Sequence, residues 1–349
     1  MDARAEMLGD DEFGAWGRLV SESPDGSVYS LPEYLDVLCQ AAGGRFRILG
    51  VRGGDELVGG VALYERDSRF GPYVAPRRLL HYNGLVLRRY ATRYPSEQTS
   101  RHLSTMSGLV EGLARTGYAA LKLNCASSVQ DVRPFVAARW AATPQYTYVV
   151  SIQDLEALWT RMEHNVRRLI RRCEREGTSV VADDDFDTFY RLHATTMQRI
   201  SQPCYLPEAA FRRYFETLRA RGMCRLFHAR LPTGRTLASQ LVLLGVKPTS
   251  HTVAAAADPE FLQTGVSAFL RFKVFGALAE MGFSGNDLTD ASLNPVTHFK
   301  AQLGGDLRLF LALEGPRTWA YRLGHGTVTA LRRAFGAVRR TGGQVRRQS

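Results

Sequence analysis

Three polar side chains near the carboxyl-terminal end of the chain have types and spacing suited to a reaction at a carbonyl group. Asp287 and Asp290 come at the end of a short predicted strand, 283–289, and Lys300 follows in a predicted helix that begins at Pro295. A carboxylate in such a place can orient an amine or accept its proton. A lysine beside a developing oxyanion, or beside a donor phosphate, lowers the barrier where water is excluded. The open alternatives are a solvated surface lysine and, for Asp290, a helix cap or an ion pair.

The segments that carry these residues have a simple order. Apolar residues recur at three- and four-residue steps over 266–281, which predicts a helix with a buried face. Gly282 ends that helix in the position of a left-handed cap, and the acidic strand 283–289 follows. The helix that carries the lysine then leads, through Gly304-Gly305, into a predicted strand 307–313.

The order of elements in the first half of the chain recurs in the second half: helices, a hairpin, a helix and a strand. We interpret this as two divergent copies of one α/β fold, with a boundary near residue 150. The predicted helices cover 8–22, 32–40, 97–116, 164–176, 186–201 and 207–221, and the predicted strands cover 45–51, 57–65, 118–124, 224–231, 236–246 and 251–257.

The helix, acidic strand, Phe-Lys helix and final strand resemble the closing half of a GNAT-type acyltransferase fold. More narrowly, they resemble the FemAB-like tandem-GNAT family of aminoacyl- and acyltransferases. The resemblance implies two GNAT-like α/β domains, 1–150 and 151–322, the second of which carries the donor and catalytic site. A coiled-coil arm is not expected, because the sequence has no uninterrupted pair of long heptad helices.

The resemblance also implies roles for single residues. In the family, a Phe-Lys pair before a glycine-containing turn is tied to substrate binding and catalysis, and Phe299-Lys300 matches it. We therefore expect catalysis from Lys300 and Asp287 and substrate contacts from Phe299 and Asp290. GNAT-type enzymes need neither a nucleophile nor a metal, because an amine attacks an already activated donor. The sequence accordingly lacks a P-loop, a metalloprotease motif and a nucleophile elbow, and we expect no metal and no bound cofactor.

The loop 263–267 lies where GNAT enzymes bind pyrophosphate, before their long helix. Gly265 and Ser267 are the expected donor contacts, since a helix amino terminus offers free amides to an anion. The loop lacks the Gln/Arg-x-x-Gly-x-Gly/Ala spacing of acetyl-CoA enzymes. This departure agrees with FemAB-like relatives that accept aminoacyl-tRNA. Some relatives with similar loops use acyl thioesters, so acyl-CoA is the alternative donor.

The predicted helix 164–176 has an apolar face and an arginine-rich face. FemAB-like proteins carry a similar helix at the start of the second unit, and an arginine stripe suits the phosphates of a tRNA acceptor stem. The alternative is a solvated face partly paired with Glu174 and Glu176. The expected donor contacts on this helix are Arg168, Arg171, Arg172 and Arg175.

In the first half, Tyr34, Tyr82 and Asn83 are expected to line the acceptor cleft. Peptidoglycan-building relatives often carry a lysine shortly after the aromatic residue, where it holds a nucleotide phosphate. Val37 and Leu38 occupy that neighbourhood here. The acceptor is then more plausibly a small amine, such as a natural-product or antibiotic intermediate, with a peptidoglycan precursor peptide as the other option.

Charge and composition favour an anionic partner. The 349 residues carry a net charge of +11, which favours RNA, a nucleotide phosphate or an acidic membrane; we expect RNA and not DNA. The acidic amino terminus lacks a signal core, and no apolar run approaches the roughly 20 residues of a membrane helix, so we expect a cytoplasmic protein. The five scattered cysteines predict neither disulfides nor zinc. The basic segment 323–349 predicts an amphipathic helix that either docks on the first domain or lies on RNA or a membrane surface.

The sequence therefore predicts an aminoacyltransferase that forms an amide bond between an aminoacyl group from tRNA and an amine. An acyl-CoA-dependent N-acyltransferase of the same fold is the first alternative. A non-catalytic RNA- or membrane-associated protein is the second.

Overall fold

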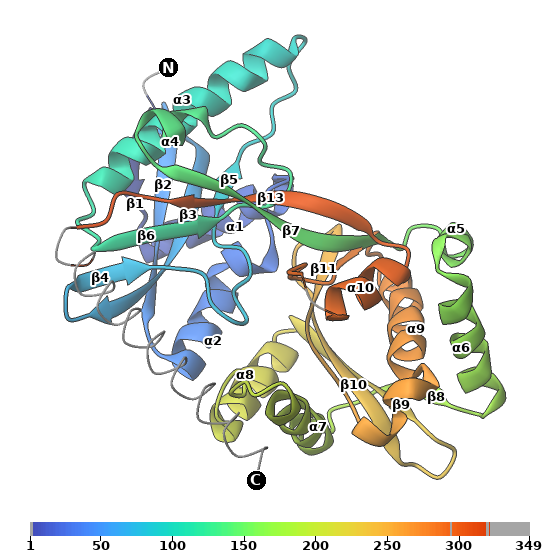
Figure 1. Ribbon diagram of the computed structural model, residues 1–349. Coiled ribbons are helices and arrows are strands. Elements are labelled where there is room, and N and C mark those ends of the chain that lie inside the picture. Colours follow the sequence, from blue (N-terminus) through green and yellow to red (C-terminus); the bar gives the residue numbers. More distant parts are fainter. Residues whose placement is uncertain (1–2, 294, 319–320, 322–349) are drawn as a thin grey trace, which may run out of the picture.

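The computed structural model describes residues 3–293, 295–318 and 321, and it is built on one continuous mixed sheet (Figure 1). The strands follow the order β1-β2-β3-β4-β6-β13-β7-β12-β11-β10-β9-β8, with β5 beside β3. Their bounds are β1 Ala3–Met7, β2 Arg45–Gly53, β3 Glu56–Ser68, β4 Gly71–Val74, β5 Leu85–Leu87, β6 Ala120–Asn124, β7 Ala141–Ser151, β8 Ser179–Ala182, β9 Cys224–Arg230, β10 Thr236–Leu243, β11 Thr249–Ala257, β12 Gly285–Asp287 and β13 Asp306–Glu314.

Helices cover both faces of this sheet. Those described are α1 Phe13–Glu22, α2 Pro32–Ala42, α3 Pro95–Ala114, α4 Arg133–Ala137, α5 Leu155–Arg161, α6 His164–Arg175, α7 Phe186–Arg199, α8 Glu208–Ala220, α9 Val266–Glu280 and α10 Pro295–Gln302.

Each half of the sheet contains one parallel pair of strands that is connected through a helix. β4 and β6 are parallel and are connected through α3, and β11 and β12 are parallel and are connected through α9. The closing strands are exchanged between the halves. β13 pairs with β6, β7 pairs with β12, and β7 and β13 pair with each other along the 9 residues of β13. This exchange joins the two halves and places β12 in the middle of the sheet.

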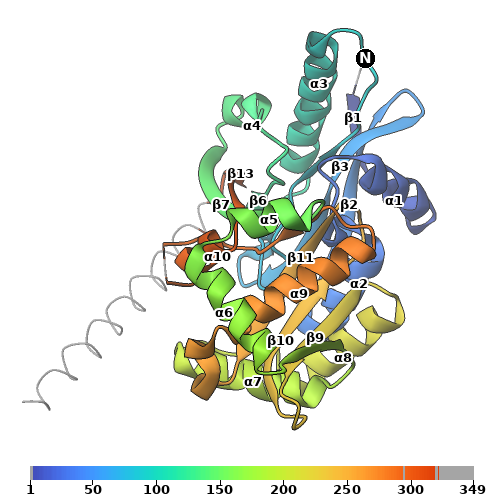
Figure 2. The same ribbon diagram turned by 90° about the vertical axis from the view of Figure 1, so that its right-hand side faces the viewer.

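Three hydrophobic cores hold the helices to the sheet. One is shared by both halves, because α1 and α2 meet α7 and α8 in it through Trp16, Leu35, Phe189 and Phe211. A second lies under α5, α6 and α9, which Figure 2 shows over the sheet of the second half. The third packs α3 against the sheet of the first half. Because the first core crosses between the halves, the region between them is firmly packed on one side.

Most predicted elements are present. The hairpins at 45–65 and 224–246 are confirmed as β2–β3 and β9–β10. The strand expected at 283–289 is reduced to β12, because Thr289 and Asp290 leave extended geometry with φ of +49° each. The boundary expected at residue 150 falls within β7. The basic segment 323–349 lies outside the described residues.

Within the described ranges, no helix is long and apolar enough to cross a membrane.

Candidate active site

Asp287 lies at the carboxyl end of β12, where it accepts three hydrogen bonds. Its Oδ2 accepts one from the Tyr82 hydroxyl at 2.6 Å. Its Oδ1 accepts one from the Thr147 hydroxyl at 2.5 Å and one from the Thr289 amide at 2.7 Å. Asp287 is 3% exposed. A turn of the first half, strand β7 and the loop after β12 are thus tied together at one buried carboxylate.

The surroundings keep this carboxylate charged. Burial raises the pKa of Asp287, but His251, whose Nδ1 lies 3.8 Å from Oδ2, and His81 act in the opposite direction. With the hydrogen bonds from Thr147 and Tyr82, they hold the pKa of Asp287 below its ordinary value. Because its oxygens are bonded and shielded from solvent, Asp287 is placed to position its neighbours, whereas the sequence suggested a direct contact with the acceptor amine.

The loop after β12 has an unusual backbone that serves Lys300. Thr289 and Asp290 both lie in the left-handed region, which a β-branched threonine rarely adopts. Both of their carbonyl oxygens accept hydrogen bonds from the Lys300 Nζ, that of Asp290 at 2.6 Å. Lys300 is 7% exposed. This burial excludes the alternative of a solvated surface lysine.

Lys300 remains a cation at neutral pH. Burial and the neighbouring Arg271 lower its pKa to about 8, while Asp290 and Asp287 act to raise it. An ammonium group has three N–H donors, and two of them bind the two carbonyls of the loop. The third donor has no acceptor among the residues that the structure describes, so it is available to an oxyanion or a phosphate.

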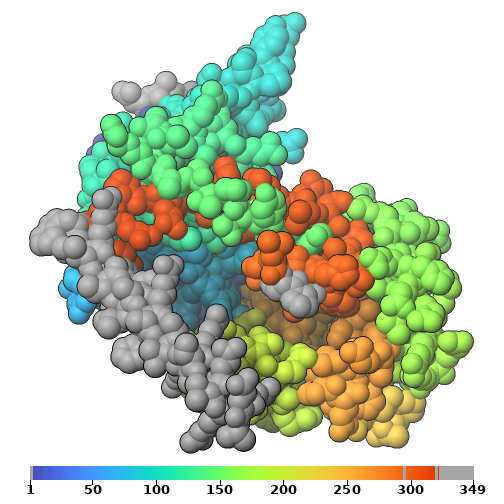
Figure 3. Space-filling view, viewed as in Figure 1, coloured from blue at the N-terminus to red at the C-terminus, as the bar shows by residue number. Residues whose placement is uncertain are grey.

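A central cleft of 410 Å³ lies beside this loop, between the two halves. Figure 3 shows this face hollowed between the orange-red segments and the yellow-green helices, with the blue first half behind. Four polar atoms of the lining side chains are buried and have no hydrogen-bond partner in the described part of the chain: Tyr29 Oη, Arg77 Nε, His81 Nε2 and Asn124 Oδ1. Buried polar atoms need partners, so the central cleft is suited to a polar acceptor.

Two of the expected acceptor residues lie at the central cleft or directly behind it. Asp290 lines the cleft, and its carboxylate accepts a hydrogen bond from the Ser292 amide at 3.0 Å. Tyr82 lies one layer deeper, and its ring packs against His81 at 4.5 Å between centroids. Its hydroxyl is bound to Asp287. Tyr82 therefore supports the wall of the cleft from behind.

The other two expected acceptor residues are not brought to the cleft. Tyr34 is completely buried, and its hydroxyl bonds to the Leu79 carbonyl and, at 2.9 Å, to the Tyr214 hydroxyl. Asn83 donates to the Lys122 carbonyl at 3.0 Å and accepts from the Asn124 amide at 2.8 Å. The polar atoms of both side chains form hydrogen bonds within the protein, so these residues stabilise the fold.

A second cavity, of 500 Å³, lies among α6, α9 and α10, and we call it the α9 cavity. Gly265, with φ of +89°, precedes α9, whose first amides have no acceptor within the helix. Ser267 and Phe299 line the cavity together with Gly265. Alanines at 255–257 of β11 form another wall, and their small side chains leave room. The expected donor residues outside α6 are thus brought together.

Residues that line the central cleft and the α9 cavity lie on either side of Lys300, which itself lines neither cavity. Phe299 lines the α9 cavity, whereas Thr289 and Asp290 line the central cleft. Lys300 follows Phe299 in the chain and binds the carbonyls of both cleft residues. Residues around the carboxyl end of α7 also divide between the cavities. Met197 and Ile200 line the central cleft, whereas Thr196 and Arg199 line the α9 cavity. A buried cation is therefore connected to the wall of one cavity through its chain neighbour and to the wall of the other through its hydrogen bonds.

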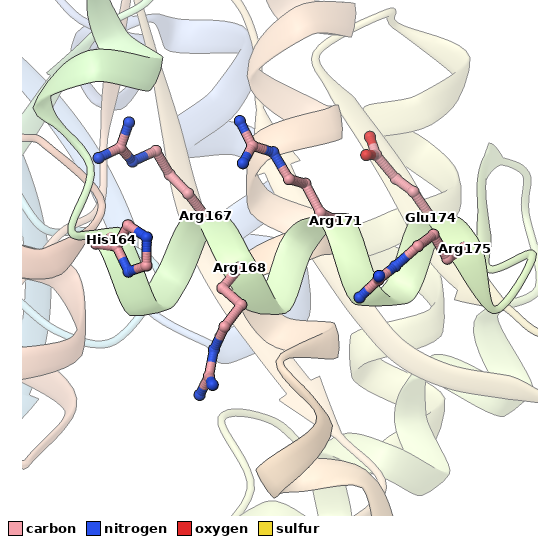
Figure 4. A pocket seen from close by; sticks show the side chains of 6 residues that line it. All are labelled: His164, Arg167, Arg168, Arg171, Glu174 and Arg175. Atoms are coloured by element: carbon pink, nitrogen blue, oxygen red, sulfur yellow. The ribbon is translucent and has the colours of Figure 1, made fainter.

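The four expected arginines of α6 do not form one continuous surface. Arg168, Arg171 and Arg175 line a shallow groove of 690 Å³, where Figure 4 shows Arg168 and Arg171 pointing to opposite sides of the helix. Arg172 instead forms an ion pair with Glu176 one turn later, with 2.7 Å between Nε and Oε1. Asn165, which accepts a hydrogen bond from Arg168 at 2.9 Å, also lines the α9 cavity. The basic helix therefore borders that cavity at one end.

Comparison with known proteins agrees with this architecture. Residues 160–301 match the family model described as an acetyltransferase (GNAT) domain. The structure is similar to that of FemX, with a TM-score of 0.67 and 15% identity over 88% of this chain and 96% of the other. The chain has a FemX-like GNAT fold. No curated protein sequence matches it.

Two further solved structures share the fold. One is L-PGS from Bacillus licheniformis, with a TM-score of 0.56 and 10% identity over 90% of this chain and 95% of that one. The other is a tandem GNAT protein from the clavulanic acid biosynthesis pathway, with a TM-score of 0.51 and 16% identity over 90% and 100% of the two chains. The expected tandem GNAT fold is confirmed, and these findings together support an acyltransferase.

Gly265 offers a test of how tightly α6 and α9 enclose the α9 cavity. A Cβ at Gly265 would lie 2.4 Å from the Leu169 Cβ on α6, and its φ of +89° disfavours other residues. We expect Gly265→Ala to lower the free energy of unfolding by about 2–4 kcal/mol in chemical denaturation. Gly234→Ala is the matched control, because Gly234 has φ of +85° and a Cβ added there would meet no atom within 4 Å. Equal losses in the two variants would contradict a tight contact between the helices.

The sequence interpretation missed Arg271, which lines the α9 cavity. A signal was present, since Arg271 is a charged residue directly between the apolar Leu270 and Phe272 of α9. It also missed Tyr29 and Asn124 of the central cleft, for which the local sequence holds no comparable signal.

Proposed function

We propose that this protein is an aminoacyltransferase that moves an aminoacyl group from aminoacyl-tRNA to an amine and forms an amide bond. The observation that carries the proposal is the position of Lys300, a buried cation that follows Phe299 of the α9 cavity and binds the carbonyls of Thr289 and Asp290 at the central cleft. The α9 cavity holds the donor end, and the cleft holds the acceptor amine. The acceptor is an amine-bearing small molecule, such as a natural-product intermediate, or a peptidoglycan precursor peptide.

The geometry supports direct transfer without a covalent enzyme intermediate. The acceptor amine attacks the ester carbonyl of the donor, and the oxyanion that forms accepts a hydrogen bond from the free N–H of Lys300. Collapse breaks the ester C–O bond, and the ribose oxygen leaves as a hydroxyl with the proton that the amine has lost. Burial lowers the pKa of His81, so its imidazole is neutral at pH 7. Its lone pair is available in the central cleft for the proton that the amine loses.

Several features favour aminoacyl-tRNA as the donor. The loop before α9 lacks the spacing of acetyl-CoA enzymes, and the exposed Arg168 of α6 donates a hydrogen bond to Asn165, which lines the α9 cavity. The FemX-like fold is consistent with membership of the FemAB-like family, which uses this donor. Acyl-CoA is the second candidate, because a GNAT-type loop with a free helix amino terminus lines the same cavity.

Radiolabelled transfer from a charged tRNA pool to candidate amines tests the proposal. We expect label to enter an amide product, and we expect prior treatment of the donor with ribonuclease to abolish transfer. If transfer persists after ribonuclease treatment and requires acyl-CoA, the donor is the thioester and not aminoacyl-tRNA. A protein that binds RNA but transfers no acyl group from either donor would support the non-catalytic alternative.

A further inference from the structure

Arg271 is a buried cation without a counter-charge. It is 7% exposed, and its Nη1 has no hydrogen-bond partner in the part of the chain that the structure describes. Burial is the only influence on its pKa, which it lowers to about 10. In the ranges that the structure describes, no carboxylate pairs with the guanidinium. Its described neighbours are the ring of Phe299, 5.9 Å from the guanidinium carbon, and the charge of Lys300.

Such an arrangement is costly unless something else supplies the missing charge. Buried arginines are normally paired, because an isolated charge loses its hydration without compensation. Here two cations lie near each other, and the protein supplies carbonyl oxygens to Lys300 alone. An anion that enters with a ligand would satisfy both the hydrogen-bonding capacity and the charge of Arg271.

The α9 cavity has a second anion-binding feature beside Arg271. Gly265 leads into the amino terminus of α9, where the helix dipole and the first amides favour negative charge, although the Ala268 amide already donates to the Gly265 carbonyl at 3.0 Å. Ser267 and Arg271 are four residues apart on α9, so they lie on the same face of the helix, and both line the cavity. A planar guanidinium presents two parallel donors to a phosphate. The features that converge on this cavity are those of a phosphate site.

We propose that Arg271 binds a phosphate group of the donor in the α9 cavity, together with the amino terminus of α9. This inference rests on the proposed function, since it takes the α9 cavity to be the donor site. The phosphate belongs either to the 3′-terminal nucleotides of tRNA or to the pyrophosphate of coenzyme A. In both cases, the bound anion also places the donor carbonyl beside Lys300.

The test measures binding of three probes: inorganic pyrophosphate, an RNA minihelix that ends in CCA, and coenzyme A. We expect Arg271→Met to weaken binding of pyrophosphate, and of whichever larger probe is the donor, at least tenfold. Arg271→Lys keeps the positive charge but lacks the two parallel N–H donors of a guanidinium, so we expect an intermediate loss of binding affinity. Arg219→Gln is the control, because Arg219 is exposed on α8 and paired with Asp184. The larger probe whose binding is weakened identifies the source of the phosphate: the minihelix indicates tRNA, and coenzyme A indicates a thioester donor.

Thermal stability distinguishes ligand binding from a structural role. Without ligand, we expect the Tm of Arg271→Met to equal or exceed that of the wild type, because the variant removes an uncompensated buried charge. A fall in Tm with unchanged binding of all three probes would overturn the inference, as would a wild type that binds none of them.

The failure of this inference is distinguishable from failure of the proposed function. If the wild type binds the probes through Arg271 but transfers no acyl group, the proposed function fails and the phosphate site stands. If transfer occurs and Arg271→Met leaves the donor KM unchanged, the phosphate site fails and the proposed function stands. The pH profile adds a third readout. Because the charge of Arg271 lowers the pKa of Lys300, the alkaline limb of the rate moves to higher pH in Arg271→Met and stays in place in Arg271→Lys.

Discussion

Lys300→Met is expected to lower kcat for amide formation about 10²–10³-fold, the loss that follows removal of one oxyanion donor from a preorganised site. The reason is the position of the ammonium group. Two of its N–H groups are fixed by the carbonyls of Thr289 and Asp290, so the third is held in one direction without rearrangement. Initial rates of labelled amide formation at saturating donor and acceptor measure this effect.

The controls for Lys300 separate chemistry from folding. Lys247→Met removes an exposed lysine, over the Phe283 ring at 5.7 Å, and should leave kcat unchanged. In the wild type, the rate should fall as pH rises through about 8, where Lys300 loses its proton. Lys300→Met should lack this alkaline limb. A Lys300→Met enzyme with the wild-type rate would contradict a catalytic role for Lys300.

Asp287→Ala is expected to lower the free energy of unfolding by about 3–5 kcal/mol and to abolish transfer. The substitution leaves the Tyr82 and Thr147 hydroxyls and the Thr289 amide without their shared acceptor in a buried place. The Thr289 turn then loses its support, and Lys300 loses the carbonyls that orient it. Chemical denaturation and the transfer assay measure the two effects on one preparation.

Acid stability provides a second test of Asp287. Its pKa is lower in the folded protein than the ordinary aspartate value of about 4. The carboxylate therefore contributes stability above that ordinary pKa, and this contribution is lost as pH falls through the lower folded pKa. Asp287→Asn should lack this dependence and should be affected less than Asp287→Ala. Asp290→Ala is the control for stability, with a loss below about 1 kcal/mol, because its side chain is exposed and bonds to nearby Ser292.

The sequence alone determined the elements around the site and much of their order. The glycine-preceded helix α9, the acidic end of β12 and the Phe299-Lys300 helix were predictable, because apolar periodicity, turn residues and chain adjacency are local properties. The same local patterns indicated the amphipathic, arginine-rich helix α6, and the resemblance of these elements to a known family implied the GNAT fold. They also marked Gly265, whose positive φ is a backbone requirement at one position.

Only the tertiary structure decided which side chains meet. Asp287 is bound by Thr147 and Tyr82, 140 and 205 residues away in the chain. These contacts depend on the exchange of β7 and β13 between the halves, and on a register that no local pattern specifies. For the same reason, the sequence placed Tyr34 at the cleft, although its hydroxyl is bound in the core. The uncompensated charge of Arg271 likewise became visible only when its neighbours were known, because the absence of a partner is a property of the packed structure.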